Sequence, residues 1–169
     1  MSVLKDVAQY SHSITEALDT ITNAHRTCNL IIGIGDGEEG YANGIEYSGY
    51  VAVPYDDETL LPVNETWHQQ IPDVVYNGMD WDCPGYTQKL MEQLQKYHGS
   101  IDVTATTQNI LPTVQTGDLH IAVTDLTDSK MHVSFCRKTT ADESEPMYAY
   151  QRQFTELPMQ DLFALTPTH

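Results

Sequence analysis

The chain has 169 residues, 40% of them hydrophobic, and a formal net charge of −16 with a sequence pI of about 4.4. This length suits one domain or part of one, and the acidic balance excludes nucleic acid as a partner, because that binding depends on Lys and Arg side chains. The absence of a basic stripe argues against an anionic membrane surface. No apolar run approaches the roughly 20 residues of a membrane-spanning helix, so we expect no membrane span.

Two short helices are expected at the start of the chain. Apolar side chains within Val3–Ala8 follow helical spacing. Ser13 and Glu16 form a capping box, which predicts that a second helix begins near Ile14. The apolar face of this second helix would consist of Ile14, Ala17, Leu18 and Ile21.

Residues 33–40, GIGDGEEG, fit the pattern G-x-G-x-x-G of dinucleotide-binding loops. Such a loop offers backbone N–H groups to a pyrophosphate, and the carboxylates of Asp36, Glu38 and Glu39 would repel that anion. The residues that follow are rich in Tyr, Val and Gly and are not typical of a helix. We therefore predict a turn between two strands here, and no dinucleotide site.

Three strands and a long loop are expected around this turn. The strands cover about Thr27–Ile34, Ala42–Ser48 and Tyr50–Pro54. Asn43-Gly44, inside the second of them, is also a turn signal. Residues 55–72 are acidic, contain two prolines and are typical of a long surface loop.

A longer helix and a brief one follow in the second half of the chain. Pro84 suits the first turn of a helix, where its missing N–H costs nothing, and Gly99 is the expected stop. One face of this helix would carry Tyr86, Leu90, Met91, Leu94 and Tyr97. The brief helix, near Thr104–Leu111, should end at Pro112.

The clearest hairpin signal lies at residues 119–136. Apolar and polar side chains alternate on both sides of a turn at Asp125–Lys130, as half-buried antiparallel strands require. Residues 147–154 are typical of another strand, and Met159–Leu165 of a short terminal helix. Helices at both ends, with hairpins and a helix pair between them, indicate an α+β fold in which helices pack on antiparallel sheets.

Histidine and acidic side chains are the candidates for metal binding. His120 and His132 are expected on facing strands, on the same side of the hairpin, but no third ligand is identifiable. The acidic cluster that begins at Asp36 does not fit a calcium loop, because Tyr47 occupies the twelfth position. We predict no metal site and no cofactor.

The three cysteines are Cys28, Cys83 and Cys136, and a reactive thiol needs a base or positive surroundings. Cys28 follows His25 and Arg26, but its place at the start of an apolar strand predicts a buried structural thiol. Cys83 has a plainer role at the entry of a helix, and Cys136 ends a strand. The residues alone therefore predict no complete catalytic set.

Five stretches in order resemble one family. They are NAHRTCNLIIGIGDGE, IEYS, VVYNGMDWDCPGYTQKLMEQLQKYHGSI, QTGDLHIAVTDLTDSKMHVSF and AYQRQFTELPMQDLF. Together, from about Ile14 to Phe163, they resemble the C-terminal half of the acyl-coenzyme A:6-aminopenicillanic acid acyltransferase-like family. These are cysteine N-terminal-nucleophile (Ntn) hydrolases, related to phospholipase B-like proteins and acid ceramidases. The resemblance implies that residues 1–169 form a single, partial domain of an αββα sandwich, in which two antiparallel sheets stack between helices.

The resemblance also implies an activity, namely acyl transfer or hydrolysis of N-acyl amide or ester substrates. In the family a precursor cleaves itself before a Cys, whose thiolate then attacks a carbonyl with the free α-amino group as base. That nucleophile belongs upstream of the matched stretches, so we expect this chain alone to be inactive. Its expected partners are the missing N-terminal half or subunit and a small-molecule acyl substrate. The acidic pI, the family and the sequon at Asn64 indicate a lysosomal or secreted parent.

Two residues are singled out by the resemblance. Family enzymes place an Asn amide near the oxyanion, and Asn29 lies in roughly the corresponding strand; the alternative is an Asn that satisfies local backbone groups. Arg152 either pairs with a nearby carboxylate, the reading we favour, or faces the binding pocket. The competing function is a complete, non-catalytic domain that binds a partner or a lipid-like ligand.

Overall fold

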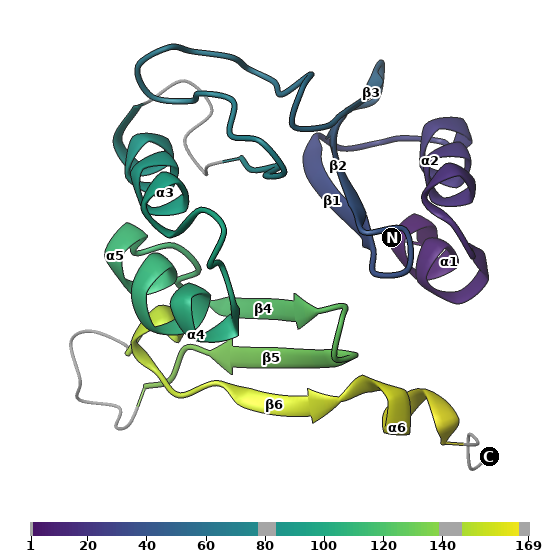
Figure 1. The fold of residues 1–169 in the computed structure, drawn as a ribbon. Helices are drawn as coiled ribbons and strands as arrows, with labels where there is room; N and C mark the ends of the chain where they lie inside the picture. Colours follow the sequence, from purple (N-terminus) through teal and green to yellow (C-terminus); the bar gives the residue numbers. More distant parts are fainter. Residues whose placement is uncertain (1, 78–83, 139–146, 166–169) are drawn as a thin grey trace. The chain divides into compact units, whose positions relative to one another are not determined.

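The computed structural model describes residues 2–77, 84–138 and 147–165, and the chain forms two compact units, Met1–Asn77 and Gly78–His169 (Figure 1). Each unit contains helices and a three-stranded antiparallel sheet, so the predicted α+β class is confirmed. The first unit comprises α1 (Ser2–Tyr10), α2 (Ile14–Asn23), β1 (Leu30–Asp36), β2 (Tyr41–Tyr47) and β3 (Ala52–Tyr55). The second comprises α3 (Pro84–Tyr97), α4 (Val103–Ala105), the π-helix η1 (Thr106–Ile110), α5 (Leu111–Val114), β4 (His120–Asp125), β5 (Lys130–Phe135), the 3-10 helix η2 (Ala149–Gln151), β6 (Thr155–Pro158) and α6 (Met159–Ala164).

The first unit has its core between α2 and the sheet β1-β2-β3. The predicted cap of α2 is present, since the Ser13 hydroxyl accepts a hydrogen bond from the Glu16 N–H at 3.2 Å. Ile32 of β1 pairs with Ile45 of β2, and both lie in one buried cluster with Ile21 of α2. Burying a side chain of this size contributes about 2 kcal/mol, so this cluster accounts for the docking of the helix on the sheet.

The predicted turn between two strands is present from β1 to β2. Asp36 Oδ1 accepts hydrogen bonds from the backbone N–H groups of Glu38 at 2.8 Å and Glu39 at 3.2 Å. Gly40 adopts a φ of +62°, a conformation that favours glycine. A strand, and not a helix, follows.

Asn43-Gly44, a turn signal in the sequence, lies in the middle of β2. Gly44 pairs with Gly33 on one side and Tyr55 on the other, and a Cβ on Gly44 would lie 2.3 Å from the Tyr55 ring. The Asn43 amide donates to the Tyr55 carbonyl at 3.2 Å. Contacts with β3 therefore override the local turn preference of this pair.

Residues 55–72 were expected to be a long surface loop. The connection from β3 to residue 77 does lack long strands, but part of it is buried. Leu60, His68, Ile71 and Tyr76 are all buried. The Nδ1 atom of His68 contacts the Pro62 carbonyl, and its Nε2 atom lies 3.2 Å from the Tyr76 carbonyl. The imidazole thus ties two distant points of the loop together.

The helices of the second unit follow the prediction at their start and depart from it at Pro112. Gly99 has a φ of +76° and follows the end of α3, as expected. The helical segment that begins at Val103 continues past Pro112 to Val114, because a π-turn in which the Leu111 N–H bonds the Thr106 carbonyl precedes it. Pro112 thereby falls in the first turn of α5, where a missing N–H is tolerated.

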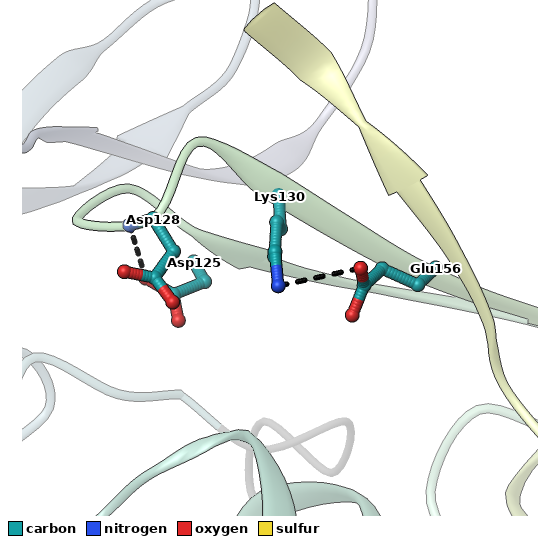
Figure 2. A network of polar contacts seen from close by, with 4 residues as sticks. All are labelled: Asp125, Asp128, Lys130 and Glu156. Atoms are coloured by element: carbon teal, nitrogen blue, oxygen red, sulfur yellow. Dashed lines mark hydrogen bonds and ion pairs between the residues drawn. The ribbon is translucent and has the colours of Figure 1, made fainter.

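The second sheet has the order β4-β5-β6, and α6 continues directly from β6 (Figure 1). The predicted hairpin and terminal helix are confirmed. At the tip of the β4-β5 hairpin, Lys130 Nζ lies 3.3 Å from Glu156 Oε1 of β6. The Asp125 carboxylate there accepts a hydrogen bond from the Asp128 N–H at 3.0 Å (Figure 2). The strand predicted at 147–154 is wrong. Within this segment Met147 forms an isolated bridge with Arg137 and Ala149–Gln151 form η2, and β6 begins after it, at Thr155.

Candidate functional site

A polar cluster in the first unit joins the start of β2 to the end of β3. The Tyr41 hydroxyl donates to Asp56 Oδ2 at 2.7 Å. Asp56 Oδ1 accepts from the Thr59 hydroxyl at 2.6 Å and from the backbone N–H groups of Thr59 and Glu58 at 2.9 and 3.1 Å. The carboxylate therefore uses both oxygens within the protein.

The pKa values of Asp56 and Tyr41, and of two further tyrosines of the first unit, shift away from neutral pH. Hydrogen bonds from Thr59 and then Tyr41 lower the pKa of Asp56 to about 2. The same contact, with a smaller contribution from desolvation, raises the pKa of Tyr41. Burial raises the pKa of Tyr55, and it raises the pKa of Tyr76 to about 12. Each of these shifts moves away from neutral pH, so the cluster is suited to hydrogen bonding and not to proton transfer.

Asn43 is the polar residue that sequence reasoning missed. Its side chain is 7% exposed, and its Oδ1 atom accepts no hydrogen bond from the described residues. A buried acceptor of this kind is uncommon and marks a place where water or a ligand atom can bind. The sequence offered only a turn signal at Asn43-Gly44, inside an expected strand, and nothing in it indicated a buried, unpartnered amide oxygen.

Asn29 and Arg152, the two predicted site residues, lie in different units. Asn29 is exposed and immediately precedes β1, which begins at Leu30 and not at Thr27. Arg152 Nη1 donates to the backbone carbonyl of Phe135, and within the described part of the chain it pairs with no carboxylate. The guanidinium thus ties the segment after η2 to the end of β5.

The expected buried thiol at Cys28 is wrong. Cys28 is exposed, because the strand begins two residues after it. Cys136 is half-buried and free, and Cys83 lies outside the described residues.

His120 and His132 do not share a face of the hairpin. His120 pairs with Phe135, whereas His132 pairs with Val123, so the two imidazoles project from opposite sides of the sheet. Within residues 2–77, 84–138 and 147–165, no group of three or more His, Cys, Asp or Glu side chains could hold a metal ion. None of the helices in the described part of the chain has the length and hydropathy that crossing a bilayer requires.

Two curated proteins of Dictyostelium discoideum, protein dcd1A and protein dcd1B, are similar to this α+β chain. Each is 34% identical to it, over 168 and 176 residues, and the alignments cover 95% and 98% of this chain. They cover 38% and 34% of the two relatives, so the chain spans about a third of their length. No family model matches the chain, and no solved structure matches it.

Proposed function

We propose that this chain is the C-terminal portion of an acyltransferase or amide hydrolase that uses an N-terminal Cys supplied by another part of the protein. The observation that carries the proposal is the pair of three-stranded antiparallel sheets, each in a unit with its own helices. Such elements are the material of an αββα sandwich. The greater length of the two relatives supports a chain that works as part of a larger protein.

In this proposal the chain supplies the framework of the site and not its nucleophile. The thiolate of the other part attacks an amide or ester carbonyl, and the acyl-enzyme passes its acyl group to water or an amine. Asn29, which is exposed ahead of β1, is the proposed donor to the developing oxyanion. Arg152 is the proposed binding residue, through the guanidinium N–H groups that the Phe135 carbonyl does not use.

The first test is the intact mass of the native gene product, with N-terminal sequencing. We expect a longer precursor, or a co-purifying chain whose first residue is Cys. A mature product of about 19.0 kDa that begins at Met1 or Ser2 would remove the enzyme proposal. The second test is hydrolysis of an N-acyl amide by this native product, which alkylation of the N-terminal Cys should abolish. Residues 1–169 alone should show no activity.

The second candidate is a non-catalytic domain that binds a partner or a lipid-like ligand. Exposed apolar side chains in the second unit, where Leu119 is 69% and Phe163 is 78% exposed, offer such a domain a contact surface, although a fragment would expose them as well. The two proposals differ in the solution state of residues 1–169. A fragment should aggregate or recruit its missing part, whereas a self-sufficient domain should be monomeric and unfold cooperatively.

A further inference from the structure

The first unit contains a cavity of about 310 Å³, open to solvent on one side, where the connection between α1 and α2 meets the end of β1. Its apolar lining includes Val7, Ile14, Ala17 and Ile34. Its polar lining includes His12 and Asp36. A volume of this size lies at the lower end of the range for small-molecule sites, which combine an apolar surface with a few polar groups.

The polar lining of this cavity favours a cation. Asp36 uses Oδ1 to accept the N–H groups of Glu38 and Glu39, whereas its Oδ2 accepts no hydrogen bond from the described residues. Glu16 also lies near the cavity, since its carboxylate accepts the backbone N–H of His12, a lining residue, at 2.8 Å. In a chain with a net charge of −16, an anion is repelled and a cation is attracted to this place.

We propose that the cavity binds a small organic cation, namely a protonated primary alkylamine with a short aliphatic chain. The ammonium group donates to Asp36 Oδ2, and the chain lies against Ala17 and Ile34. A linear chain of about six carbons suits a site of this size. This inference goes beyond the proposed acyl transfer and does not depend on it, because none of the lining residues has a role in that proposal.

The test is a calorimetric titration of residues 1–169 at neutral pH and constant salt with three probes of one length: n-hexylammonium, 1-hexanol and hexanoate. We expect saturable binding of hexylammonium, about tenfold tighter than that of hexanol, as a hydrogen bond to a charged group predicts. Hexanoate should not bind. Equal affinity for hexanol or hexanoate, or no saturable binding of the amine, would overturn the proposal.

Two substitutions at the acidic turn separate a specific contact from general attraction. Asp36→Asn keeps an acceptor for the turn N–H groups and removes the charge, so affinity for hexylammonium should fall about tenfold. Glu38→Gln removes the same charge from the same turn at a residue that does not line the cavity, and it should change affinity less than about twofold. Equal losses in the two variants would mean surface attraction only and would refute the site.

A third variant tests the cavity without touching its charge. Ala8 lines the cavity and is exposed on α1, so Ala8→Leu narrows the cavity at a position where leucine is a good helix former. We expect a loss of hexylammonium binding with an unchanged melting temperature. Full binding by this variant would show that the amine sits elsewhere.

Discussion

The two sheets differ in how completely their apolar side chains are buried. In the first sheet, Ile32 and Ile45 form one cross-strand pair on the face that packs with α2. In the second, Val123 lies on one face, whereas Val133 and Phe135 lie on the other, and Phe135 is 59% exposed. The first sheet therefore has a buried core on the face that packs with α2, whereas one face of the second sheet carries a largely exposed aromatic side chain.

The largest loss of folding stability is expected from substitutions where the first sheet packs against α2. Ile45 is fully buried, so Ile45→Ala should lower the free energy of unfolding by about 3 kcal/mol, through lost transfer energy and an unfilled cavity. Val123→Ala, at a half-buried position of the second sheet, should cost about 1 kcal/mol. Urea denaturation measures both. Equal losses would break the distinction between the two sheets.

Gly44 offers a second test of close packing in the first unit. In Gly44→Ala the new Cβ would lie 2.3 Å from the buried Tyr55 ring, so we expect a loss of about 2 kcal/mol in thermal or urea unfolding. The matched control is Gly33→Ala, directly opposite in register, where a Cβ meets no atom within 4 Å. If both variants unfolded alike, the ring would not be fixed over Gly44.

Phe135 tests whether the second sheet awaits cover. Because its side chain is 59% exposed, Phe135→Ser should change the free energy of unfolding by less than about 0.5 kcal/mol. The same change should reduce self-association of residues 1–169, which analytical ultracentrifugation measures. A large loss of stability without any change in association would place Phe135 in a core and contradict this view.

The smallest effect is the pH dependence from Asp56, which lies in the first unit. Its pKa is lowered to about 2 in the folded chain, so its contribution to stability is present above pH 3.8 and is lost as the pH falls toward 2. Asp56→Asn should remove this pH dependence, so the variant should be less stable than the wild type near pH 7, and the difference should shrink as the pH falls toward 2. Thermal unfolding between pH 2 and 5 checks this, with Asp19→Asn, at an exposed position of α2, as the control.

Local signals predicted those features that depend on a few neighbouring residues. The Ser13 cap, the stop at Gly99 and the turn after Asp36 all form as expected, because each is satisfied by hydrogen bonds or backbone angles within a few positions. The candidate site was harder to predict from the sequence. Asn43 is notable only because its oxygen is buried without a partner, which depends on β3 and is invisible in the residues around it.

The sequence by itself determined that this is an acidic α+β chain with antiparallel hairpins, since charge, apolar alternation and capping are properties of short segments. The tertiary structure decided which face each side chain occupies. His120 and His132 are separated because the four-residue turn pairs Asp125 with Lys130, and a shift of one position in that register would reverse the face of every residue in one strand. Asn43-Gly44 remains in a strand, and the loop around His68 is buried, because long-range contacts outweigh the local preferences of these segments.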